Sequence, residues 1–153
     1  MPSGVPKKPT TNAPLGAGFF SDFHRALMNM PGVQKPSECW SWPDSLDAVI
    51  AAPKHHSVLL EDERVRVLRT TIPPGDVVPL HTHRWGGVAY VESWSHFIRR
   101  GERGEILFDS RQAGAPPTIP CAQRMQPLPP HTVENLGPLE ISILIVELKD
   151  SRK

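Results

Sequence analysis

The chain has 153 residues, a length that suits one domain of ordinary size. Its 17 Lys and Arg residues nearly balance its 16 Asp and Glu residues, so bulk charge gives no reason to expect binding to nucleic acid or to a membrane surface. No stretch approaches the roughly 20 apolar residues of a membrane helix, and prolines and lysines near the N-terminus interrupt any apolar core of a signal peptide. We therefore expect a cytoplasmic protein that binds neither nucleic acid nor membrane.

The 18 prolines are the unusual feature of the composition. Because proline is scarce inside helices and central strands, this number predicts short elements separated by stiff turns, as in an all-β domain with a poorly structured arm. The two cysteines, Cys39 and Cys121, are too few for a disulfide framework and lack the spacing of a zinc site. We expect both to be reduced thiols.

The N-terminal third divides into two segments. Residues 1–18 are rich in Pro, Gly, Thr and Lys, which predicts a flexible arm or a segment that becomes ordered against a partner subunit. Residues 19–55 predict a helical extension. Its first short helix is expected over about 21–30, where apolar residues follow helical spacing, and its second over about 45–52.

Residues 56–153 have the pattern of a β-domain. Turn signals recur, and the segments between them are short and rich in β-branched residues. Short strands with turns at intervals of roughly 8 to 12 residues predict a sandwich or a small barrel. The last segment is almost continuously apolar, so both of its faces are expected to be covered. The expected strands are 57–60, 64–72, 77–83, 87–93, 96–100, 105–109 and 139–148.

His81 and His83 form the sharpest chemical feature of the sequence. In a strand, residues two apart point to the same side, so both imidazoles reach one metal ion at about 2.0–2.1 Å. His131 is the candidate third ligand, because it follows a run of prolines and we expect it in a rigid turn. The alternative for such a pair is exposed or core histidines without a metal.

The two histidine motifs resemble those of the cupin superfamily. Gly75 precedes His81 by five intervening residues and His83 completes the first motif, while His131 and Asn135 match the end of the second. The resemblance covers roughly residues 56–148. It implies a cupin-type jelly-roll barrel with a metal ion inside it, and commonly a homodimer.

The sequence departs from the family pattern in two places. Gln-Pro-Leu at 126–128 stands where the second motif has Pro-x-Gly, and Gly87 stands where the first motif has its Glu ligand. The remaining set of three histidines is similar to that of the thiol and diketone dioxygenase branches, which use Fe(II). The resemblance therefore implies a divalent metal ion, with Fe(II) favoured and Zn, Ni or Mn as alternatives. Otherwise, water or Glu92 replaces the carboxylate and the site is only structural or vestigial.

Three residues are candidates for a substrate pocket. Trp85 lies two residues after a candidate ligand and either walls the pocket or caps the core. Gly87 leaves space next to the ion. His96 is a possible catalytic residue, as a base or a donor to substrate, although its face of the strand is not determined by the sequence.

Other polar and aromatic side chains are interpreted as structural. His55 and His56 are expected on the surface at the start of a strand, and Trp94 is expected to be a packing residue. Arg99 and Arg100 are expected on a solvated face. Arg124 is expected on the surface, with binding of a substrate carboxylate as its alternative.

The predicted function is that of a metal-binding small cupin, and specifically an oxygenase-type enzyme acting on a small organic acid, thiol or diketone. One alternative is a non-catalytic module that binds a metal or small molecule, as a sensor or storage protein. The other is a non-redox isomerase or lyase in which the metal is a Lewis acid.

Overall fold

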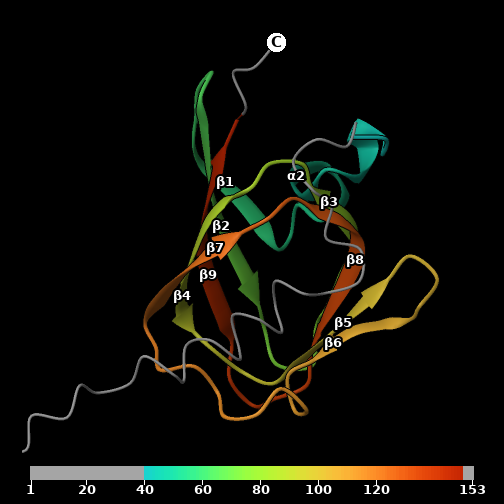
Figure 1. Ribbon diagram of the computed structural model, residues 1–153, viewed down its shortest axis with the longest axis vertical. Coiled ribbons are helices and arrows are strands. Elements are labelled where there is room, and N and C mark those ends of the chain that lie inside the picture. The colour runs from blue at the N-terminus through green and yellow to red at the C-terminus, as the bar shows by residue number, and fades with distance from the viewer. Residues whose placement is uncertain (1–39, 150–153) are drawn as a thin grey trace, which may run out of the picture.

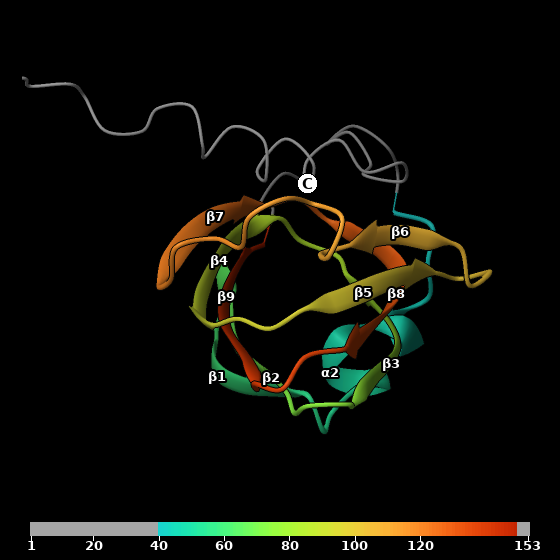
Figure 2. The same ribbon diagram turned by 90° about the horizontal axis from the view of Figure 1, so that it is seen from below.

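Two antiparallel sheets face each other and close a barrel. A computed structural model describes residues 40–149 of the chain (Figures 1 and 2). The prediction of an all-β barrel with a short helical segment before it is confirmed. The elements are η1 (Asp44–Leu46), α2 (Ala48–Ala51), β1 (His56–Glu61), β2 (Val65–Ile72), β3 (Val77–His83), β4 (Gly87–Ser93), β5 (Phe97–Gly101), β6 (Ile106–Asp109), β7 (Cys121–Met125), β8 (Leu128–Asn135) and β9 (Ile141–Leu148).

The chain crosses repeatedly between the two sheets. One sheet has the order β1-β2-β9-β4-β7 and the other has the order β3-β8-β5-β6. The view in Figure 2 looks into the space that the sheets surround, with α2 beside β3. Among the described residues, no helix is long and apolar enough to cross a membrane.

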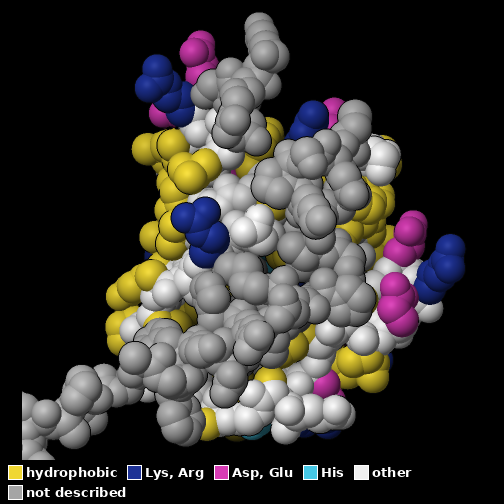
Figure 3. Space-filling model, viewed as in Figure 1, with side chains coloured by type: hydrophobic (Ala, Val, Ile, Leu, Met, Phe, Trp, Pro, Cys, Tyr) yellow, Lys and Arg dark blue, Asp and Glu magenta, His cyan; other side chains and the backbone are white. Residues whose placement is uncertain are grey.

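Alternation along the strands separates an inner face from an outer one. In β2, every second residue is buried, and these include the apolar Leu68 and Ile72. Val78, Ile98 and Ile141 from other strands are also buried. The outer face of the larger sheet carries exposed apolar side chains, which gather along one side of the molecule in Figure 3.

Strand β9 is covered less completely than its sequence predicts. It lies between β2 and β4, so both of its edges are paired. Ile141 and Ile145 are buried on its inner face, but Leu144 and Val146 on the outer face are only partly buried and Leu148 is 54 % exposed. The prediction that both faces are covered was wrong. The apolar sequence of β9 goes with its central position in the sheet, whereas only its inner face is buried.

The helix predicted over 45–52 is present as two short pieces. A side-chain oxygen of Asp47 accepts a hydrogen bond from the backbone N–H of Val49 at 3.1 Å and so caps α2. Thr82 Oγ1 donates to the carbonyl of Leu46 at 3.1 Å, which ties η1 to β3. The expected arm over 1–18 and helix over 21–30 lie outside the described residues.

His131 lies on a strand and not in a rigid turn, so that part of the prediction was wrong. Strand β8 pairs with β3 and β5, and its two prolines lie at the end where pairing with β3 is irregular and pairing with β5 has ceased. Proline is tolerated at such positions because no regular ladder hydrogen bond is lost. The two adjacent prolines explain why the sequence did not predict this strand.

Two motif residues are structural. Gly75 has a φ of 75°, a left-handed conformation that favours glycine, in the turn before β3. Asn135 is fully buried at the end of β8. Its Nδ2 donates to the carbonyls of Ile72 and Leu139 at 2.9 and 2.7 Å, so it joins three chain segments.

We predict that Gly87→Ala destabilises the fold. A Cβ at position 87 would overlap the carbonyl oxygen of Val146 on the paired strand β9. We expect a loss of about 1–3 kcal/mol or more in the free energy of unfolding, the usual range for overpacking. Denaturant titration measures it. Val88→Ala is the control, since Val88 is 41 % exposed, and the prediction is contradicted if the two variants are equally stable.

Candidate metal centre

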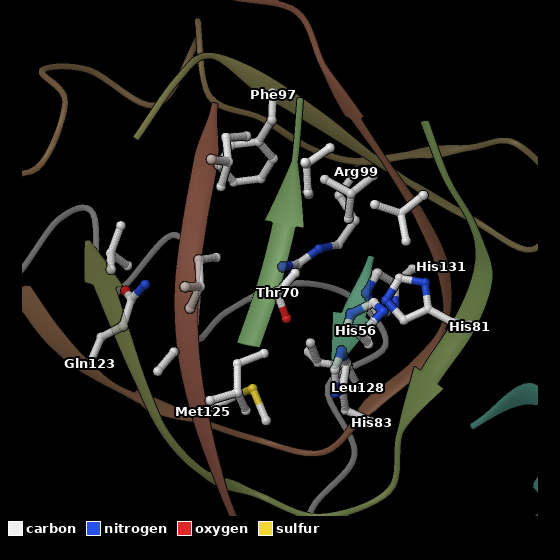
Figure 4. Close-up of a pocket in the computed structure, with 18 of the residues that line it drawn as sticks. His56, Thr70, His81, His83, Phe97, Arg99, Gln123, Met125, Leu128 and His131 are labelled. Atoms are coloured by element: carbon white, nitrogen blue, oxygen red, sulfur yellow. The ribbon is translucent and has the colours of Figure 1, made fainter. Parts of the chain in front are cut away.

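Four buried histidines converge inside the barrel from three strands. His56 begins β1, His81 and His83 lie on β3, and His131 lies on β8. Each is at most 4 % exposed. His81 and His131 are direct partners across the β3–β8 pair, so the two predicted motifs meet as expected. Figure 4 shows the rings grouped at one side of a cavity.

The rings are close enough to share one ion. The ligand nitrogens of His56, His81 and His83 all lie within 4.8 Å of one another. The centroid of the His131 ring lies 4.3 Å from that of His81 and 6.0 Å from that of His83. We call these four residues the histidine cluster. His56, His81 and His83 form the tight group of three, and His131 lies next to this group, beside the His81 ring.

Hydrogen bonds determine which nitrogen each ring offers. Nδ1 of His81 donates to the carbonyl of Pro79 at 2.7 Å, and Nδ1 of His131 donates to that of Pro129 at 2.7 Å. Nδ1 of His56 donates to the carbonyl of Ala52 at 3.2 Å. These partners accept only, so the proton is on Nδ1 and the lone pair is on Nε2. Metal-binding histidines in proteins are held in this way.

His83 is held by a carboxylate instead of a carbonyl. Its Nδ1 donates to Glu147 Oε1 at 2.8 Å, and Glu147 is fully buried. The other carboxylate oxygen accepts from Arg66 Nε at 2.6 Å, and the two Nη atoms of Arg66 donate to Asp47 at 2.9 and 3.0 Å. One guanidinium between two carboxylates leaves one negative charge in excess beside His83.

Burial keeps three imidazoles of the cluster neutral at neutral pH. Burial, and secondarily the charge of neighbouring histidines, lowers the pKa of His56 from 6.5 to about 3. Burial likewise lowers the pKa of His81 and of His131 well below 6.5. Neutral imidazole is the form that binds a metal ion, so no proton has to be removed from these rings before binding. The donor set and its tautomers fit a divalent metal ion.

The sequence prediction missed His56. The expected surface position of His55 and His56 was wrong, because they are only 6 % and 4 % exposed. His56 does begin a strand, as expected, but it is the only buried residue of β1. His55 lies outside the cluster, where its Nε2 lies 3.0 Å from Asp76 Oδ2. A single inward residue on an edge strand leaves no periodic signal in the sequence.

The carboxylate near the site comes from Glu147 and not from Glu92. Glu92 is exposed and accepts hydrogen bonds from Arg69 and Ser142 at 2.6 and 2.8 Å. Gly87, at the family's Glu position, is the direct partner of Glu147 in the β4–β9 pair. Its lack of a side chain permits the close approach of β9, and Gly87 is not among the residues that line the cavity.

Two other pocket candidates lie elsewhere. Trp85 packs beneath Arg66, whose guanidinium carbon is 4.8 Å from the ring centroid, and beneath Lys149 at 5.3 Å. It therefore covers the Arg66–Glu147 pair, which corresponds to the alternative of a cap. Nδ1 of His96 lies 3.2 Å from Ser110 Oγ, and the centroid of its ring lies 4.8 Å from that of the Trp94 ring. Neither Trp85 nor His96 is among the described residues that line the cavity.

The cavity beside the histidine cluster has a volume of about 120 Å³. It has room for a small organic molecule, since one water needs only about 10–15 Å³ on this measure. No Asp, Glu or Lys is among the described residues that line it. Its walls are mainly aliphatic and include Ile72, Val78, Val91, Ile141, Ile143 and Ile145.

Two lining residues were assigned other places from the sequence. Arg99 lines the cavity, so its expected position on a solvated face was wrong, whereas Arg100 does lie 3.8 Å from Glu134 in a partly exposed ion pair. Trp94 also lines the cavity, and its buried Nε1 has no hydrogen-bond partner in the described part of the chain. Arg124 is exposed, as expected, and contributes to the cavity lining. The alternation of β5 places Arg99 inside and Arg100 outside.

The structure is similar to solved structures, although no family model and no curated protein matches the sequence. A cupin domain from Bordetella pertussis superposes with a TM-score of 0.50 at 20% identity, over 62% of this chain and 92% of that chain. A cupin superfamily protein from Desulfitobacterium hafniense has a TM-score of 0.42 at 10% identity, over 79% and 98% of the two chains. The polyketide cyclase RemF from Streptomyces resistomycificus has 0.43 at 16% identity, over 67% and 70%.

These comparisons bear on the fold. The match to the Bordetella pertussis domain shows that this chain has the cupin fold. The fold predicted from the two histidine motifs is therefore confirmed.

We predict that the metal-free protein loses stability as the pH falls below 6.5, the ordinary pKa of an unfolded histidine. Below this pH the unfolded chain binds protons that the folded cluster does not, because the folded pKa values are lowered. Each imidazole contributes up to about 1.4 kcal/mol per pH unit until its folded pKa is reached. Denaturant midpoints of chelator-treated protein between pH 5 and 8 measure the slope.

His56→Gln provides the check on this assignment. The variant lacks one of the three shifted imidazoles, so its stability should fall less steeply below pH 6.5. A wild-type midpoint that stays constant between pH 7 and 5 contradicts the prediction.

Proposed function

We propose that the protein binds a divalent metal ion at the histidine cluster and is an oxygenase-type enzyme acting on a small organic acid, thiol or diketone. The observation that carries the proposal is the convergence of buried imidazoles whose Nδ1 atoms all have acceptors. Such an arrangement costs burial of polar groups, and a metal ion bound by the Nε2 atoms would compensate for it.

The charge of the cluster favours an anionic substrate at a bound divalent ion, for which we propose Fe(II). Neutral imidazoles would leave the charge of a bound ion unbalanced, and the excess negative charge of the Glu147–Arg66–Asp47 group lies behind His83. When bound, Fe(II) supplies Lewis acidity and open positions for substrate and O2. Imidazole also suits Zn and Ni, so the ligands alone leave these metals as alternatives.

The protein's own contribution is binding, orientation and exclusion of water. Aliphatic side chains enclose the space beside the cluster. Since no Asp, Glu or Lys is among the described lining residues, acid–base chemistry on a bound molecule would depend on imidazoles that we assign to the metal. This supports an oxygenase over an isomerase or lyase that relies on a protein base.

We predict that protein purified without a histidine tag contains a divalent metal, with iron as the main element. His81→Ala should remove most of it, because the ligand set would lose a central member. Elemental analysis after reconstitution measures occupancy. His96→Ala is the control, since His96 is not among the cavity-lining residues. Metal content at trace level in reconstituted wild type contradicts the proposal.

The ligand set itself is tested by separate variants. His56→Ala and His131→Ala should each lower metal affinity, with the larger loss at His56 if the tight group of three forms the primary site. A loss at His131 alone would support the three ligands expected from the sequence. O2 consumption with thiols, diketones and organic acids then separates an oxygenase from a binding module. The homodimer and cytoplasmic location expected from the sequence remain predictions.

We predict that Glu147→Gln lowers metal affinity by about 10–100-fold, the usual effect of removing a partner of a ligating histidine. The amide cannot offer the same negative charge to His83. Competition with a chromophoric chelator measures the affinity. Asp47→Asn is the matched control, because Asp47 binds the same guanidinium without touching His83. An equal loss in both variants would show that Glu147 acts only through stability of the ion-pair network.

A further inference from the structure

Arg99 brings a positive charge into the cavity next to the histidine cluster. It lies on β5 and is the cross-strand partner of Val133 on β8. His131 lies two residues before Val133 on β8, and side chains two residues apart on a strand share a face. Arg99, Val133 and His131 therefore all face inward, and all three line the cavity. Figure 4 shows the Arg99 side chain extending from its strand toward Thr70. Burial lowers the pKa of Arg99 to about 10, so the guanidinium stays charged at neutral pH.

Thr70 supplies a second, independent feature. It is the cross-strand partner of His56 in the β1–β2 pair, and it lines the cavity. The residue is only 5 % exposed, and its buried Oγ1 has no hydrogen-bond partner within residues 40–149. Buried hydroxyls rarely stay unpaired, because each one costs about 1–3 kcal/mol. A bound molecule with an acceptor atom would satisfy this hydroxyl.

We infer that Arg99 and Thr70 form a carboxylate subsite beside the histidine cluster, so that the substrate is a small monocarboxylate with an apolar body. The inference rests on the proposed function, because it selects the organic acid among the three substrate classes. A guanidinium presents parallel N–H groups that match the two oxygens of a carboxylate. A neutral thiol or an uncharged diketone offers no such match.

The rest of the cavity agrees with this substrate class. Beyond Thr70 and Arg99, the lining is mostly aliphatic and aromatic, including Ile143, Phe97 and Val91. The described lining residues include no Asp or Glu, so a carboxylate meets no like charge in the cavity. Of the two arginines that line it, Arg124 is exposed and Arg99 is not. A single carboxylate group brings the anionic charge there, and its alkyl portion occupies the apolar part.

The test is calorimetric titration with probes of nearly equal size and different head groups. Isovalerate is compared with its isosteric amide, isovaleramide, and with acetylacetone and isobutanethiol. Zinc-loaded protein is used, so binding is measured without turnover. Isovalerate should bind at least about tenfold more tightly than isovaleramide, as expected for hydrogen bonds to a charged group.

Variants assign the preference to the two residues. Arg99→Gln should remove the preference for the acid, Arg99→Lys should retain part of it, and Thr70→Val should weaken isovalerate by about threefold or more. Arg100→Gln is the matched control, since Arg100 is the next residue on the strand and pairs with Glu134 on the other face. Thermal unfolding of each variant verifies that it is folded.

The same titrations on chelator-treated protein separate this inference from the metal site. If zinc binds but isovaleramide or acetylacetone equals isovalerate, or Arg99→Gln changes nothing, the carboxylate subsite is wrong and the metal centre stands. If the wild type binds no metal, the proposed function fails. The subsite is then supported by an Arg99-dependent preference for isovalerate in metal-free protein, and overturned by its absence.

Discussion

The arrangement on which the site depends is the burial of neutral imidazoles with protonated Nδ1 atoms. Backbone carbonyls of Ala52, Pro79 and Pro129 accept three of these protons, and each carbonyl lies in the same chain segment as its histidine. The backbone therefore orients the rings locally, without help from distant side chains. Because these protons are on Nδ1, the lone pairs are on Nε2, and the ligand nitrogens of His56, His81 and His83 lie within 4.8 Å of one another.

The ion-pair network extends this order to one end of the barrel. Arg66 on β2 bridges Glu147 on β9 and Asp47 beside α2, while Trp85 lies against its guanidinium. Buried charge is tolerated here because every group has a close partner of opposite charge. The short helical segment before the barrel thus has a role that its sequence did not reveal. It supplies the Asp47 carboxylate, which accepts hydrogen bonds from both Nη atoms of Arg66.

Sequence reasoning found the parts of the site that have a local pattern. His81 and His83 follow the period of a strand, and the spacing to Asn135 identified the second motif and the cupin fold. The buried positions of His56 and Arg99 were not predicted, because they depend on which face of a short strand turns inward. The neighbouring polar residues give no alternating pattern that would identify that face. The sequence does contain a signal for Glu147 that the prediction missed. It is a charged residue on the same face as Ile143 and Ile145 in an otherwise apolar strand.

The missing carboxylate of the first motif has a geometric counterpart. A side chain at position 87 on β4 is blocked, because its Cβ would overlap the carbonyl of Val146 on β9. Its direct partner across the strand pair is Glu147, whose carboxylate reaches His83. In the metal site that we propose, the carboxylate would therefore lie on β9, hydrogen-bonded to the candidate ligand His83, and not at position 87, where the family pattern has its Glu. An arrangement of this kind would stabilise a bound cation electrostatically while leaving its coordination positions open, which is the condition that the proposed anionic substrate requires.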